Sequence, residues 1–185
     1  NFVIAAEICE DVWVPCPPSI RHTLAGATVI ANCSASDETT GKAGYREALI
    51  SGQSARLVCA YIYANAGEGE STQDLVFGGH DMIAENGNIL AKSERFKNGM
   101  ITADIDLYRL KNERRRMTTC QPGVEAEDYD FMDFTLEPVD LTLKRYIDPA
   151  PFVPSNAEER TARCEEILTI QAMGLKKRLA HTGVK

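Results

Sequence analysis

Near its beginning the chain reads Phe2-Val3-Ile4-Ala5-Ala6-Glu7-Ile8-Cys9-Glu10-Asp11-Val12-Trp13. Residues 2–6 form an uninterrupted apolar run with the length of a short buried strand. Three prolines, at positions 15, 17 and 18, follow closely and predict an extended loop, so the chain turns sharply just after Cys9. Enzymes of the α/β class place exposed nucleophiles at strand ends, because the turn lifts the side chain out of the sheet. Cys9 is therefore a candidate nucleophile.

Cys9 also has a purely structural interpretation. A cysteine that follows a strand is commonly a small buried hydrophobic residue. A nucleophilic cysteine must be a thiolate, which needs a neighbouring cation or base. Glu7, Glu10 and Asp11 instead place negative charge beside Cys9 in the sequence, and negative charge disfavours a thiolate. If Cys9 is a nucleophile, its activating cation must come from elsewhere.

The composition is typical of one soluble globular domain or a large part of one, with 185 residues, 44% hydrophobic and 25% charged. The formal net charge of −7 argues against nonspecific nucleic-acid binding. No apolar run is long enough to span a membrane, and no basic leader or cleavage-like site indicates a signal peptide. The sequence therefore predicts a cytoplasmic protein with no nucleic-acid partner and no membrane partner.

Six cysteines are scattered along the chain, at Cys9, Cys16, Cys33, Cys59, Cys120 and Cys164. None of them forms a C-x-x-C pair, and the three histidines lie far apart in the sequence. The pattern suits a reduced protein better than a disulfide scaffold or a zinc site, so no metal is predicted. Cys33 and Cys59 lie in apolar stretches and are expected in the core.

Strand and helix patterns alternate through the first third of the chain. They predict strands over 2–6, 27–31 and 60–64, and helices over 20–25, with Ser19 as its N-cap, and over 41–60. This order is typical of parallel crossover units, whose strand ends would bring Cys9 and Ser36 to one edge of the sheet. In the second helix the apolar positions predict a buried face at Tyr45, Ala48, Leu49, Ala55, Val58 and Cys59. The other face would carry Lys42, Arg46, Glu47, Gln53 and Arg56.

Antiparallel strands are predicted next. Asn86-Gly87 between the apolar runs 75–84 and 88–92 predicts a hairpin. Residues 100–106 alternate like a further strand, and a charged helix follows to Arg116. The glycine-rich loop 65–72 has no dinucleotide-binding fingerprint and is expected to shape a turn or line a site. Together these patterns predict an α/β fold with a mixed sheet.

The last third of the chain changes character. Residues 118–154 are acidic, interrupted by prolines and dotted with aromatics, which predicts an extended linker that docks through those aromatics. Ser155 and Glu158 have the spacing of a capping box, so they predict the start of a helix that runs to about His181. Gly183 is expected to end that helix.

Residues Glu7 to Pro15 resemble the nucleophile segment of the nitrilase, or carbon–nitrogen hydrolase, superfamily. Longer motifs are similar to the glutaminase domain of the glutamine-dependent NAD synthetases: Asn32-Cys33-Ser34-Ala35-Ser36, Gly41-Lys42, Gln53-Ser54-Ala55-Arg56, Tyr63 to Thr72 and Asp74 to His80. Residues 163–175 resemble the approach to the synthetase domain of that family. The resemblance implies part of a nitrilase-type α-β-β-α sandwich: residues 1–117 as a partial glutaminase domain, 118–154 as the linker, and 155–185 as a helix leading into a synthetase domain outside this sequence.

The same resemblance implies a chemistry. The family uses a Glu-Lys-Cys triad, and only its cysteine, Cys9, matches this sequence; the base and the lysine are expected in a preceding segment. Cys9 would attack the side-chain amide of L-glutamine, form a thioester and release ammonia. Ser36 and Lys42 match residues that bind glutamine in the family, although some relatives carry arginine at position 42. Glu10 and Trp13 are expected to line the same pocket, with Glu10 near the substrate ammonium group.

The resemblance implies no cofactor in these residues. ATP, Mg²⁺ and deamido-NAD would bind the synthetase domain, which would receive ammonia through a sealed channel, and a homo-oligomer is expected. Two other hypotheses stay open. The chain could belong to a stand-alone nitrilase-type amidase acting on a different amide. Alternatively, these residues alone could form an inactive scaffold, because the triad glutamate and lysine are missing from them.

Overall fold

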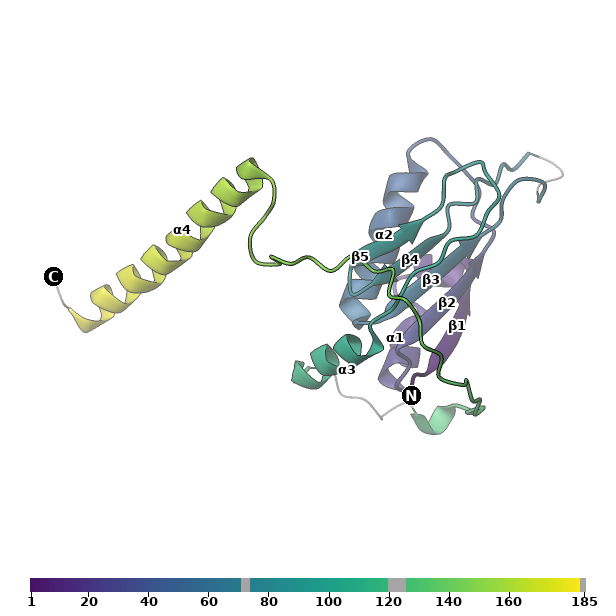
Figure 1. The fold of residues 1–185 in the computed structure, drawn as a ribbon, viewed down its shortest axis with the longest axis horizontal. Helices are drawn as coiled ribbons and strands as arrows, with labels where there is room; N and C mark the ends of the chain where they lie inside the picture. The colour runs from purple at the N-terminus through teal and green to yellow at the C-terminus, as the bar shows by residue number, and fades with distance from the viewer. Residues whose placement is uncertain (71–73, 120–125, 184–185) are drawn as a thin grey trace. The chain divides into compact units, whose positions relative to one another are not determined.

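A computed structural model describes residues 1–70, 74–119 and 126–183. Five strands form one sheet in the order β1-β2-β3-β4-β5 (Figure 1): β1 Ile4–Ile8, β2 Val29–Ser34, β3 Ala60–Asn65, β4 Met82–Glu85 and β5 Asn88–Lys92. The first three strands are parallel, and β4 and β5 continue the sheet antiparallel. The predicted α/β fold with a mixed sheet is confirmed.

The helices are η1 Cys9–Trp13, α1 Pro18–Leu24, α2 Lys42–Leu57, α3 Leu107–Arg116, η2 Ala126–Asp128 and α4 Ala157–Thr182. One core cluster joins Ile30, Tyr61 and Met82 of the sheet to Ile50 of α2. A second cluster on the opposite face joins Val29 and Ala60 to Leu110 of α3. Because side chains alternate along a strand, α2 and α3 cover opposite faces of the sheet.

The hairpin predicted at Asn86-Gly87 is present, and both residues have positive φ, 46° and 87°, as a tight β4–β5 turn requires. The run 75–84 does not form one strand; β4 begins only at Met82. Gly79 and His80 have φ values of 70° and 68°, so the backbone leaves the extended region just before the strand.

The strand predicted at 100–106 is wrong, since these residues have no regular structure. Of their apolar residues, Ile105 packs against the second cluster. The Asp106 N–H donates to Glu85 at 2.6 Å, and the Asp106 side chain caps α3 by accepting from the Arg109 N–H at 2.8 Å. The alternation therefore reflects docking and capping rather than strand pairing.

Two helix starts also differ from prediction. Pro17 is the N-cap of α1, and Ser19 lies buried inside the helix, where its N–H donates to Glu7. In α4 the N-cap is Asn156 rather than Ser155, because the Asn156 side chain accepts from the next N–H groups of the helix. The predicted end at Gly183 is confirmed, with φ of 69°.

Cys59 is buried as expected, but Cys33 is exposed. Cys33 lies on the same face of β2 as Val29, beyond the part of that face that Leu110 covers. Ile8, which pairs with Cys33 between β1 and β2, is exposed as well, at 67%. Cys120 and the end of the 65–72 loop lie outside the described residues.

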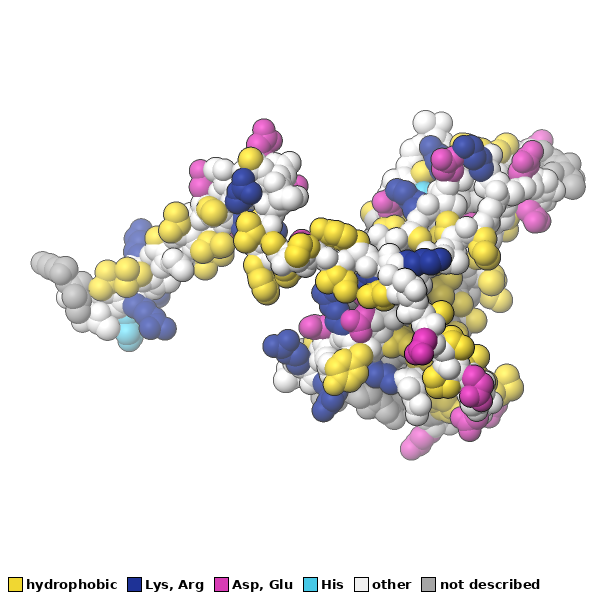
Figure 2. Space-filling model, in the orientation of Figure 1, with side chains coloured by type: hydrophobic (Ala, Val, Ile, Leu, Met, Phe, Trp, Pro, Cys, Tyr) yellow, Lys and Arg dark blue, Asp and Glu magenta, His cyan; other side chains and the backbone are white. Residues whose placement is uncertain are grey.

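Contacts divide the chain into one unit over 1–145 and a second over 146–185. Within the first, the predicted docking of aromatics holds for two residues: Tyr129 contacts His22, and the rings of Phe134 and Phe2 lie 5.5 Å apart. In the second, α4 has no buried residue and its hydrophobic side chains are exposed (Figure 2). The domain boundaries predicted at 117/118 and 154/155 stay predictions.

Among the residues the structure describes, no helix combines the length and hydrophobicity needed to cross a bilayer.

Candidate active site

Cys9 lies immediately after β1, at the first position of η1, and its backbone is left-handed with φ of 51°. This conformation is uncommon for a residue other than glycine and costs about 1–3 kcal/mol. The surrounding chain holds it: Asn32 Nδ2 donates to the Cys9 carbonyl at 3.5 Å, and the Ile8 N–H donates to Asp11 Oδ2 at 2.7 Å. The sharp connection predicted after residue 8 is therefore present, with a half-buried thiol-bearing residue on it.

Glu7 does not belong to an acidic surface around Cys9. It is 2% exposed, and its carboxylate accepts from the Ser19 N–H at 2.8 Å and from the Tyr61 hydroxyl. Burial, followed by the bond to this carboxylate, raises the pKa of Tyr61 above its ordinary value, so the hydroxyl remains a donor. Glu7 thus fastens β1 to α1 and β3 beneath the turn that carries Cys9.

Lys42, in the first turn of α2, is held from two sides. Its Nζ lies 2.6 Å from Asp37 Oδ1 and 5.5 Å from the centre of the Trp13 ring. The hydrogen bond and charge of Lys42 lower the pKa of Asp37, so this carboxylate is ionised at neutral pH. Tyr45 continues the stack, with its ring 5.4 Å from that of Trp13.

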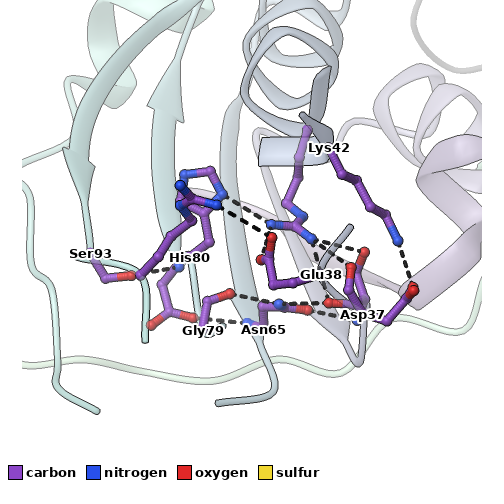
Figure 3. A network of polar contacts seen from close by, with 11 residues as sticks. Asp37, Glu38, Lys42, Asn65, Gly79, His80 and Ser93 are labelled. Carbon is purple, nitrogen blue, oxygen red and sulfur yellow. Dashed lines mark hydrogen bonds and ion pairs between the residues drawn. The ribbon is translucent and has the colours of Figure 1, made fainter. Parts of the chain in front are cut away.

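Arg46 forms the centre of a buried polar network, whose partners Asp37, Glu38 and His80 are labelled in Figure 3. Its side chain is fully buried and pairs with Glu38 at 2.7 Å, while its Nη2 donates to Ser36 Oγ at 3.3 Å. It also donates to the carbonyls of Ser36 and Asp37, at 3.4 and 3.2 Å, and to His80 Nδ1 at 3.1 Å. One side chain of α2 therefore binds the whole loop 36–38.

Asn65, at the end of β3, holds the same loop from the opposite side. Its Oδ1 accepts from the Ser36 N–H at 2.8 Å, and its Nδ2 donates to the carbonyls of Ser36 and Gly79 at 3.1 and 2.6 Å. The Asn65 N–H in turn donates to Asp81 Oδ1 at 2.8 Å. Ser36 is consequently fixed at both its main chain and its hydroxyl, and it is 7% exposed.

The five residues singled out from sequence occupy two segments. Cys9, Glu10 and Trp13 belong to η1, whereas Ser36 lies in the connection from β2 to α2 and Lys42 is the first residue of α2. The structure brings Trp13 directly to Lys42 and links Lys42 to the Ser36 loop through Asp37. Glu10 is exposed. Their roles in binding and catalysis stay predictions.

The predicted buried face of the second helix is confirmed at Val58 and Cys59, which follow α2, but is wrong at Tyr45, which is 63% exposed. The buried residues within α2 are Arg46, Ile50, Gln53 and Ser54. Sequence reasoning therefore missed Arg46 and its partners Glu38 and His80. One signal was available: Lys42 and Arg46 share a helical face and follow two consecutive acids, Asp37 and Glu38, that can pair with them.

In the parts of the chain that the structure describes, no group of three or more His, Cys, Asp or Glu side chains is placed to hold a metal ion. The polar groups of the site instead offer hydrogen-bond donors, the ammonium group of Lys42, the buried guanidinium of Arg46 and a thiol.

Comparisons with known proteins point to one family. The model of the carbon–nitrogen hydrolase family matches residues 2–115. A glutamine-dependent NAD(+) synthetase of Mycobacterium tuberculosis (strain H37Rv) is 46% identical over 97% of this chain, and one of Rattus norvegicus is 32% identical over 77%. The chain spans only 28% and 22% of the lengths of these relatives. A crystal structure of a carbon–nitrogen hydrolase from Helicobacter pylori G27 has a TM-score of 0.51 and 22% identity, covering 60% of this chain and 43% of that one, which supports the fold.

Proposed function

Because this chain belongs to the carbon–nitrogen hydrolase family, we propose that Cys9 is the nucleophile of an amide-hydrolysing site and that the amide is the side chain of L-glutamine. The observation that carries the proposal is the left-handed Cys9 at the end of β1. A strained backbone at a strand end is typical of functional sites, where the surrounding structure maintains it. The similarity to glutamine-dependent NAD(+) synthetases favours glutamine among amides.

In the proposed reaction the Cys9 thiolate attacks the side-chain carbonyl of glutamine. The C–N bond then breaks, ammonia leaves with a proton from the general base, and a thioester remains on Sγ. Water then attacks this thioester and gives a proton to the general base, and the C–S bond breaks to release glutamate and regenerate the thiolate. The general base and the cation that stabilises the thiolate come, in this proposal, from residues outside this sequence.

The described residues would then hold the substrate. Lys42 Nζ has three donors, so it can keep its bond to Asp37 and still bind the substrate carboxylate. Ser36 would supply a fixed polar contact, and Trp13 a flat wall beneath Lys42. Glu10, which is exposed on η1, would face the ammonium group of glutamine.

At the level of the whole protein, we propose a glutamine-dependent NAD synthetase. The ammonia would pass through a channel to a synthetase domain and convert deamido-NAD to NAD with ATP and Mg²⁺. Residues 118–185 would join the two domains, and the protein would act in the cytoplasm as a homo-oligomer. The support is the similarity of nearly the whole chain to enzymes of this name.

The test is covalent labelling of the full-length native protein with a glutamine-analogue electrophile, with the adduct located by mass spectrometry. We expect modification of Cys9, its loss in Cys9→Ala, and its retention in the matched control Cys33→Ala, which removes a more exposed thiol. An adduct at Cys16 or Cys33 with none at Cys9 would overturn the proposal.

Two further measurements, amide hydrolysis by the full-length protein and labelling of the 185-residue chain, separate the alternatives. Hydrolysis of simple aliphatic amides with no preference for glutamine would indicate a stand-alone amidase. Labelling of the 185-residue chain by itself would refute the inactive-scaffold hypothesis, and we expect no such labelling because the residues of a triad act as a unit.

A further inference from the structure

We infer that Arg46 is a positioning residue for glutamine binding, because it fixes the loop 36–38 that carries Ser36 and holds Lys42. The inference rests on the proposed function and assigns Arg46 no contact with substrate. Arg46 lies on α2, one turn after Lys42, and its side chain is fully buried.

The first argument is the reach of the guanidinium group. It donates to Ser36 Oγ, to the Ser36 carbonyl and to the Asp37 carbonyl, and it pairs with Glu38. Arginine presents its donors in a rigid fork, so these bonds define both the position and the orientation of the loop. Lysine has a flexible stem and a single nitrogen, and it cannot reproduce this set.

The second argument is the link from the loop to Lys42. Arg46 holds the Asp37 carbonyl, while the Asp37 carboxylate lies 2.6 Å from Lys42 Nζ. A displacement of Asp37 would therefore move the cation proposed to bind the substrate carboxylate. Arg46 thus acts on both candidate binding residues, on Ser36 directly and on Lys42 through Asp37. Figure 3 shows the side chain of Lys42 directed at Asp37.

The third argument is energetic. Removing an ion pair such as Arg46–Glu38 from water is costly, and well-packed apolar residues often replace buried pairs without loss of stability. Stability alone is therefore a weak reason for a charged group at this place. The carbonyls of Ser36 and Asp37 and the Ser36 hydroxyl, however, accept hydrogen bonds from Arg46. An apolar side chain in place of Arg46 could not orient these groups.

The test uses Arg46→Lys in the full-length native protein. Lysine retains the charge opposite Glu38 but loses most of the bonds to the loop. We expect the KM for glutamine to rise by about tenfold, which corresponds to the loss of one charge-assisted hydrogen bond at the substrate, while kcat changes by less than about threefold. Arg56→Lys is the matched control, since it makes the same change at an exposed position of the same helix.

A second readout distinguishes positioning from a general structural role. Labelling of Cys9 by the glutamine-analogue electrophile should slow by about the same factor as KM rises, whereas labelling by iodoacetamide, which lacks the amino-acid group, should be unchanged. Arg46→Gln, which removes the buried charge and keeps an amide donor, provides a second variant with the same expected ratio of labelling rates.

The outcomes separate the two proposals. If the unaltered protein is not labelled at Cys9, the proposed function fails. If it is labelled and Arg46→Lys matches Arg56→Lys in KM and in both labelling rates, the positioning role fails. The inference would also be overturned if Arg46→Lys slowed the labelling of Cys9 equally with both electrophiles, or if neither Arg46 variant folded. Either result would show that Arg46 only stabilises the hydrophobic core.

Discussion

Glu85 and Arg145 are joined by two hydrogen bonds of 2.7 Å, although 60 residues separate them in the sequence. Glu85 ends β4 and is 2% exposed, and its Oε2 also accepts from the Asp106 N–H. These bonds raise the pKa of Arg145, which stays charged at neutral pH. The pair fastens the end of the first unit to the sheet.

Arg145→Met should lower the free energy of unfolding of the protein by about 2–4 kcal/mol, because it leaves the buried Glu85 carboxylate without its charged partner. Urea denaturation measures this loss. The matched control is Arg21→Met, which breaks an exposed pair with Asp128 at 54% and 66% side-chain exposure and should cost less than about 1 kcal/mol. Similar losses in the two variants would contradict the prediction.

Gly78→Ala and Gly44→Ala should change stability in opposite directions. A methyl group at Gly78 would lie 2.8 Å from Glu38 Cγ, and Glu38 is held by Arg46, so the buried pair must shift at a cost of about 1–3 kcal/mol. At Gly44, inside α2, a methyl group meets nothing within 4 Å, and alanine should stabilise the helix by about 0.5–1 kcal/mol. Thermal unfolding of both variants checks the signs.

Cys9→Gly should be more stable than Cys9→Ala by about 1 kcal/mol, because glycine adopts the left-handed φ of 51° without the clash of a Cβ atom. At Cys33, in the extended β2, the order should reverse, since glycine weakens a strand. Denaturant titration of the four variants measures both differences. An identical order at positions 9 and 33 would show that the Cys9 backbone is not strained.

His80→Asn should reduce the loss of stability in acid. Burial, followed by the charge of Arg46, lowers the pKa of His80 from its ordinary 6.5, whereas Glu38 opposes the shift. The unfolded chain therefore binds a proton before the folded protein does, and stability falls as pH drops below 6.5 towards the folded-state pKa. Asparagine does not titrate and tolerates the φ of 68°.

The measurement for His80→Asn is the free energy of unfolding between pH 7.5 and 5. The unaltered protein should show an additional slope below pH 6.5 of up to about 1.4 kcal/mol per pH unit. Above pH 7 the slopes of the two proteins should coincide, which serves as the internal control. Parallel curves over the whole range would refute the prediction.

Short-range patterns in the sequence were sufficient for much of the fold. The parallel units, the Asn86-Gly87 hairpin and the position of Cys9 at the end of a strand were all predicted, because periodicity and turn preference act over a few residues. The site was predicted less completely. Ser36, Lys42 and Trp13 were named from a family resemblance, and the structure adds the contacts that link them.

Tertiary structure alone decided which polar groups are buried and which apolar groups are not. Arg46 lies in the core because the loop 36–38, through Glu38 and two carbonyls, and His80 converge on it from two separate segments, and no helical periodicity encodes those partners. Cys33 is exposed because helix α3 covers only part of its face of the sheet. The sequence by itself determined the order of strands β1 to β5 and of helices α1 to α4, and the place of the candidate nucleophile. The buried network that supports the site arose from packing, because a charge is stable in the interior only where distant segments supply its hydrogen bonds.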